Sequence, residues 1–196
     1  MKVALDADVV AELAIQFRPR NYLRVMPKTH AATPLGMGYG QTRFASPDKS
    51  FQLIYIGRDL ATGIAETIIR DRFEGLPDRT LHASEVGDWA VSRVSAKSPL
   101  TLIDLRSSGL LKLGVTTDAA RAKAQKDGRL LSQELYDRFA IDGVLYLSRL
   151  TGAPCVAVYD RAVTVKLGAH KAIDVLKLPT LIPALVALNV KLVGSP

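Results

Sequence analysis

Strand-like and helix-like segments follow one another irregularly in this chain, without the steady alternation that builds a parallel sheet. Apolar, β-branched runs predict strands at 22–26, 51–57, 89–94, 100–105, 144–147 and 155–159. Helical spacing of apolar residues predicts helices at 8–16, 59–72 (with Asp59 as its cap), 117–126, 130–139 and 181–188, followed by a closing strand. We therefore expect an α+β fold with mixed or antiparallel sheets and flanking helices.

The length of 196 residues suffices for one domain with a sizeable core, and no Gly-, Pro- or Ser-rich linker divides the chain. We expect a single domain over 1–196. The most apolar stretch, Leu178–Val193, is interrupted by two prolines and a lysine, so we predict no membrane span. The lone cysteine, Cys155, cannot form an internal disulfide, and the N-terminus lacks a secretory pattern. These features predict a cytoplasmic protein.

The chain is basic, with 26 Lys and Arg against 19 Asp and Glu, a net charge of +7. Such a balance favours acidic partners, which include nucleic acids, phosphorylated small molecules and acidic proteins. The basic residues are spread out, and a solvated basic face explains many of them equally well. A nucleic-acid-binding module stays open on charge alone, although no recognition motif or aromatic–basic interleaving accompanies it.

Signatures of several common enzyme classes are absent from the sequence. No phosphate-binding Gly-x-x-x-x-Gly-Lys loop is present. The three histidines stand far apart, without carboxylates or cysteines at metal-ligand spacing, so we predict no metal site. Cys155 lies in an apolar run, where a buried and inert thiol is expected. Carboxylate, arginine and tyrosine chemistry is what remains.

The segment from Arg43 to Glu66 combines these three residue types. Arg43 ends a long Gly-containing loop at 27–50, which is typical of a functional or mobile loop. Tyr55 lies in the following predicted strand and Glu66 in the helix after it. Each also has an ordinary explanation: a surface charge for Arg43, a core position for Tyr55, and a helix pair of Glu66 with Arg70.

At this point the chain resembles a known family, the RES-domain proteins, which are toxins of RES–Xre type II toxin–antitoxin systems. The resemblance covers about residues 20–165 and rests on the order of several motifs. They are YLRV (22–25), GQTRF (40–44), LIYIGRDLATGIAE (53–66), LIDLR (102–106), SQELYDRFAIDGVLYLSR (132–149) and GAPCVAVYDR (152–161).

The resemblance implies a fold similar to that of ADP-ribosyltransferases and cleavage of the nicotinamide–ribose bond of NAD+, with phosphate or water as acceptor. Arg43, Tyr55 and Glu66 match the family's catalytic Arg–Tyr–Glu set. Arg24 and Ser148 match further substrate-binding positions, to which Arg43 and Tyr55 also contribute. NAD+ is then a substrate and not a cofactor, inorganic phosphate is the candidate co-substrate, and no metal is implied.

These residue types suit that reaction. A carboxylate such as that of Glu66 can stabilise an oxocarbenium-like transition state. The guanidinium groups of Arg24 and Arg43 suit a pyrophosphate, because they bind phosphate oxygens bidentately. We expect Tyr55 to stack on the nicotinamide or ribose with its hydroxyl free, and Ser148 to hydrogen-bond the substrate.

The resemblance also implies an Xre-type antitoxin as partner and contact with nucleic acid only through that antitoxin. A homo-oligomer is compatible with it. One alternative is an ADP-ribosyltransferase on the same scaffold that modifies a macromolecule. The other alternative is the basic nucleic-acid-binding module considered above.

Overall fold

The structure is a computed structural model that describes residues 5–116, 119 and 125–194. Within these residues, nine strands form one curled sheet in the order β1-β6-β7-β8-β3-β2-β5-β10, with β9 also paired to β5. The strands are β1 (Ala14–Phe17), β2 (Tyr22–Pro27), β3 (Leu53–Gly57), β5 (Trp89–Ala96), β6 (Leu100–Asp104), β7 (Gly143–Leu147), β8 (Pro154–Tyr159), β9 (Leu167–Ala169) and β10 (Ile173–Asp174). The β6–β7 pair is parallel and the others are antiparallel, which confirms the α+β prediction.

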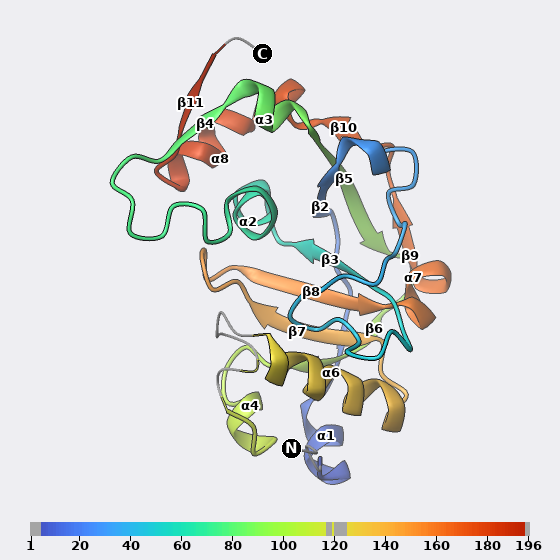
Figure 1. The fold of residues 1–196 in the computed structure, drawn as a ribbon. Helices are drawn as coiled ribbons and strands as arrows, with labels where there is room; N and C mark the ends of the chain where they lie inside the picture. The colour runs from blue at the N-terminus through green and yellow to red at the C-terminus, as the bar shows by residue number, and fades with distance from the viewer. Residues whose placement is uncertain (1–4, 117–118, 120–124, 195–196) are drawn as a thin grey trace.

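Alternation of side chains in the central strands separates two cores. Val144 and Tyr146 of β7 belong to a cluster with Leu131 and Leu135, whereas Leu145 between them belongs to a second cluster on the opposite face. On the first face lie α1 (Ala7–Leu13), α4 (Gly109–Lys112) and α6 (Lys126–Arg138), and on the second lies α7 (Asp160–Lys166) (Figure 1).

A third core lies beside β2 and β5. It is covered by α2 (Leu60–Ile64), the π-helix η2 (Ala65–Ile69), α3 (Ala83–Gly87), the 3-10 turn η3 (Val175–Lys177) and α8 (Leu181–Ala187). A small parallel pair of β4 (Thr80–His82) and β11 (Lys191–Val193) closes this end of the molecule (Figure 1). Among the described residues, no helix is both long and apolar enough to cross a membrane.

The sheet loosens between β2 and β3, and this position creates the site. The two strands share the single residue pair Leu23↔Gly57. By contrast, β3 pairs with β8 from Leu53 to Gly57, and β2 pairs with β5 from Tyr22 to Pro27. The two halves of the sheet therefore diverge beyond the shared pair, as Figure 1 shows, and side chains of both strands can line a space between them.

All six predicted strands are present within two residues of their expected ends, and Asp59 caps α2 by accepting from the Thr62 N–H at 2.8 Å. The prediction of a helix over 8–16 is wrong beyond Leu13. Residues 14–17 form β1 instead, because the alternating Ile15 and Phe17 pair with β6 and pack against the second core.

Two further helix predictions need correction at their ends. The helix predicted over 59–72 ends at Ile69, because Arg70 adopts a left-handed φ of 45° that stops it. The helix predicted from 130 begins earlier, at Lys126. Most of the helix predicted over 117–126 lies outside the described residues. The predicted 27–50 loop contains the 3-10 turn η1 (Lys28–His30) and a bridge from Gly38 to Leu53.

Candidate functional site

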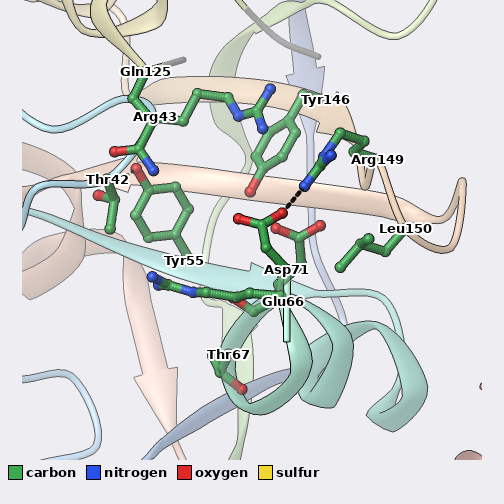
Figure 2. A pocket seen from close by; sticks show the side chains of 11 residues that line it. Thr42, Arg43, Tyr55, Glu66, Thr67, Asp71, Gln125, Tyr146, Arg149 and Leu150 are labelled. Carbon is green, nitrogen blue, oxygen red and sulfur yellow. Dashed lines mark hydrogen bonds and ion pairs between the residues drawn. The ribbon is translucent and has the colours of Figure 1, made fainter. Parts of the chain in front are cut away.

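A cleft lies where β2 and β3 diverge, and it has two halves. The narrow half, of about 160 Å³, lies between the 42–43 loop, η2 and the turn after β7. The wide half, of about 410 Å³, runs along β2 and β3. Both are lined by Tyr55, Glu66, Thr67, Arg70 and Tyr146, so they form one continuous cleft. Figure 2 shows the narrow half.

Tyr55 of β3 forms part of the floor of the cleft. Its hydroxyl accepts a 2.9 Å hydrogen bond from the Phe44 N–H and makes a second one, at 2.8 Å, with the Thr42 hydroxyl. Burial raises the pKa of Tyr55 to about 12. In this structure the hydroxyl is bonded to the loop that carries Arg43, and its expected hydrogen bond to a substrate stays a prediction.

Arg43 extends from that loop into the narrow half of the cleft (Figure 2). Its Nη1 atom is buried and has no hydrogen-bond partner within the described part of the chain. Burying such a donor without a partner costs free energy, and exceptions of this kind need an explanation. An anionic ligand in the narrow half would supply the missing acceptor.

Glu66 is placed by η2, and π-helical turns are frequent at functional sites. Its Oε1 accepts a 2.6 Å hydrogen bond from the Ser148 hydroxyl, and Ser148 is only 3% exposed. The Ser148 oxygen in turn accepts the N–H groups of Leu150 and Thr151, each at 3.2 Å. One oxygen of the carboxylate is therefore held, while the side chain lines both halves of the cleft.

The ordinary explanation of Glu66 as a helix pair with Arg70 is wrong. The Arg70 Nε donates to the backbone carbonyl of Glu66 at 3.0 Å, and the carboxylate bonds to Ser148 instead. Because Arg70 ends the helix in a left-handed conformation, its side chain does not run along the helix to the carboxylate.

Arg24 lies apart from the narrow half and lines the wide half. Its Nη1 donates to the Pro34 carbonyl at 2.7 Å and its Nη2 to the Gly36 carbonyl at 2.6 Å. Burial lowers the pKa of Arg24 to about 10, so the group stays charged at neutral pH. In this structure Arg24 fastens the loop that borders the cleft. Arg43, Tyr55, Glu66 and Ser148 are the four that come together.

Several cleft residues were not predicted. Tyr146 is 4% exposed, and burial raises its pKa well above the usual value. Its position two residues before Ser148 was a usable signal, because alternate residues of a strand share a face. An ion pair between Asp71 and Arg149 spans the rim of the narrow half (Figure 2). Cys155 is buried, as expected, and lines the wide half; burial raises its pKa to about 12.

No group of three or more His, Cys, Asp or Glu side chains arranged to hold a metal ion occurs among the residues the structure describes. The polar groups that line the cleft are instead two carboxylates, four arginines, two phenols, one imidazole, one amide and small hydroxyls. Such a set can bind phosphate oxygens and stabilise a developing cation nearby, but it has no thiolate nucleophile ready for attack.

Comparison with known sequences identifies the family. Residues 20–177 match the family model described as RES domain. This chain belongs to the RES domain family. All five residues singled out from the sequence, from Arg24 to Ser148, lie inside the stretch that defines the RES domain.

Two known proteins are similar to this RES domain. "Probable toxin y4kH" of Sinorhizobium fredii is 39% identical over 80 residues, which are 40% of this chain and 63% of that protein. A chain in the crystal structure of the M. tuberculosis MbcT–MbcA toxin–antitoxin complex matches with a TM-score of 0.65 and 15% identity, over 87% of this chain and 93% of that one. At that identity the second match shows the shared fold.

Proposed function

We propose that this RES domain is the toxin of a toxin–antitoxin system and acts by cleaving the nicotinamide–ribose bond of NAD+. The observation that carries the proposal is the pairing, in one cleft, of a carboxylate held by Ser148 with the Arg43 guanidinium, whose buried Nη1 has no hydrogen-bond partner among the described residues. The similar protein from S. fredii bears the name of a toxin, and the similar fold comes from a toxin–antitoxin complex, which supports the biological role.

In the proposed reaction the C–N bond between ribose and nicotinamide breaks, and its electron pair leaves with the neutral nicotinamide. The ribose becomes oxocarbenium-like, and the Glu66 carboxylate stabilises that charge. Because Ser148 holds Oε1, the other carboxylate oxygen is already oriented and needs no rearrangement when the reaction occurs. Water or phosphate then bonds to the ribose carbon, and a proton of water goes to solvent.

Arg43 is the group we assign to phosphate oxygens, either of the substrate's pyrophosphate or of an acceptor phosphate. Tyr55 and Tyr146 supply aromatic surface beside Glu66 for the nicotinamide or ribose ring. Arg24, at the wide half, is the remaining candidate for the pyrophosphate, once it releases the loop carbonyls.

The partner in this proposal is an antitoxin protein of the Xre type, with an acidic surface to match a toxin of net charge +7. Nucleic acid is then reached through the antitoxin. NAD+ is the substrate, phosphate is the candidate co-substrate, and the cytoplasm is the compartment in which toxin, antitoxin and NAD+ meet.

The test is incubation of the purified protein with NAD+, in the presence and absence of inorganic phosphate, with separation of the products. We expect free nicotinamide in both cases, together with ADP-ribose when water is the acceptor or phosphorylated ADP-ribose when phosphate is the acceptor. In a parallel incubation with labelled NAD+, label that stays on a protein or nucleic acid would indicate ADP-ribosylation of that macromolecule. Absence of nicotinamide release under all these conditions would contradict the proposal.

A further inference from the structure

Among the described residues, the segment 42–44 around Arg43 is bonded to β3 through the Tyr55 hydroxyl. The Tyr55 hydroxyl bonds to the Thr42 hydroxyl at 2.8 Å and to the Phe44 N–H at 2.9 Å. These two residues flank Arg43 in the sequence, so the hydroxyl fixes the backbone on both sides of the arginine. Figure 2 shows the Thr42 and Tyr55 side chains together below Arg43.

Helix α6 holds the same loop from the other side. The Ser132 hydroxyl donates to the Phe44 carbonyl at 2.7 Å, and Ser132 is fully buried. One turn earlier, the Arg129 guanidinium donates to the Ala45 and Ser46 carbonyls at 3.3 and 3.1 Å. The loop is therefore fastened between a strand and a helix, both rigid elements.

The contact between α6 and the loop leaves no room for a side chain at Gly128. A Cβ built there would lie 2.6 Å from the Arg43 carbonyl oxygen, 2.9 Å from the Arg43 Cγ and 2.4 Å from the Ala119 oxygen. The backbone and the first part of the Arg43 side chain therefore rest on the helix. Their position is set by packing as well as by hydrogen bonds.

We propose that Thr42 and Ser132 are positioning residues for Arg43. Together with the Tyr55 hydroxyl they hold the loop so that the Arg43 guanidinium faces a diphosphate group of the ligand. This inference rests on the proposed function for the identity of the substrate. A guanidinium that is fixed before the ligand arrives binds without the entropy cost of ordering its loop. Its buried, unpartnered Nη1 is the donor left for that ligand.

The test is a double-mutant cycle of Thr42→Val and Arg43→Ala, with kcat/KM for NAD+ as the readout. Removal of the Arg43 donor alone should lower kcat/KM by roughly 100-fold. Thr42→Val alone should lower it by roughly 10-fold through misplacement, and by less than about twofold once Arg43 is absent. Thr42→Ser keeps the hydroxyl and should recover most of the loss. Thr80→Val, whose hydroxyl bonds to Asp78 outside the cleft, is the matched control.

Ser132→Ala in the same cycle tests the helix side, and thermal unfolding of each variant shows whether the fold is intact. A merely structural role for Thr42 would give equal losses with and without Arg43, and that result would overturn the inference. If the unmodified protein releases no nicotinamide, the proposed function fails. In that case the double-mutant cycle uses the affinity for inorganic pyrophosphate, measured by calorimetry, as its readout. If Thr42→Val lowers this affinity equally with and without Arg43, or if no variant binds pyrophosphate, the inference is overturned.

Discussion

The Ser148 hydroxyl donates a 2.6 Å hydrogen bond to Oε1 of Glu66, and so joins two segments that lie 82 residues apart in the sequence. The same oxygen accepts two N–H groups of the turn after β7. A carboxylate held in this way has one defined orientation in the cleft. The serine is thus linked both to the stability of the turn and to the chemistry we assign to Glu66.

We predict that Ser148→Ala lowers both activity and stability. It leaves the carboxylate and two N–H groups without their partner, which should cost about 1–3 kcal/mol in the free energy of unfolding. Turnover of NAD+ should fall by roughly 10-fold because Glu66 loses its orientation. Thr151→Ala is the control: it removes a 3.0 Å contact with Thr62 and leaves the Glu66–Ser148 bond in place. Equal turnover in the two variants would contradict the role given to Ser148.

We predict that Gly128→Ala destabilises the protein. The new Cβ would collide with backbone oxygens of Arg43 and Ala119, so α6 and the loop must move apart, at a cost of about 1–3 kcal/mol. Chemical denaturation measures the change. Gly38→Ala is the control, because nothing lies within 4 Å of a Cβ at that position. An unchanged denaturation midpoint for Gly128→Ala would refute the close packing of α6 on the loop.

We predict that Arg24→Lys loosens the loop over 31–40. A lysine has one ammonium group and cannot bridge the Pro34 and Gly36 carbonyls as the planar guanidinium does. Hydrogen–deuterium exchange in the loop should become faster, and the KM for NAD+ should rise by roughly threefold to tenfold. Arg20→Lys, at an exposed position before β2, is the control. Unaltered exchange in the loop would show that Arg24 does not fasten it.

We predict a loss of stability at alkaline pH that Tyr55 partly causes. Burial raises the pKa of Tyr55 from 10.0 to about 12, so the folded state retains a proton that the unfolded state has released. The contribution of neutral Tyr55 to the free energy of unfolding is complete below about pH 10 and is lost as the pH rises through about 12. Burial also raises the pKa of Tyr146 and Tyr159, which adds to the effect.

Denaturation of the unmodified protein and of Tyr55→Phe at several alkaline pH values measures that contribution. The free energy of unfolding should fall with pH in both proteins, and less steeply in Tyr55→Phe. Tyr39→Phe, at a residue that is 55% exposed, is the matched control. Identical slopes for Tyr55→Phe and the unmodified protein would contradict the buried, neutral state of Tyr55.

Much of the sheet was predictable because its central strands carry their own pattern. In β7 and β8, successive apolar residues face two different cores, so the strands read as continuous apolar runs. The short β1 was not predictable from such a run, because four residues next to a helix become a strand only through pairing with β6. The end of η2 at Arg70 likewise depends on a left-handed backbone at a residue that rarely adopts it.

The sequence allowed most residues of the candidate site to be predicted, but not the hydrogen bonds between them. The family motifs indicated Arg43, Tyr55, Glu66 and Ser148, which the fold brings to one cleft. The hydrogen bonds of the Tyr55 hydroxyl to the Arg43 loop depend on how the loop packs against β3, which the hydrophobic pattern of the sequence does not show. Thr42 was missed for the same reason, since its hydroxyl has meaning only beside Tyr55.

The role proposed for the Glu66 carboxylate in NAD+ cleavage is tested by the rate at which a Glu66→Gln variant releases nicotinamide. Glutamine keeps an oxygen to accept from Ser148 but carries no charge to stabilise the transition state. Glu134→Gln removes a carboxylate paired with Arg138 on α6, outside the cleft, and serves as the matched control. We predict that the rate of nicotinamide release falls at least about 100-fold in Glu66→Gln and changes little in Glu134→Gln. A Glu66→Gln protein that folds and releases nicotinamide at the unmodified rate would contradict the role proposed for Glu66.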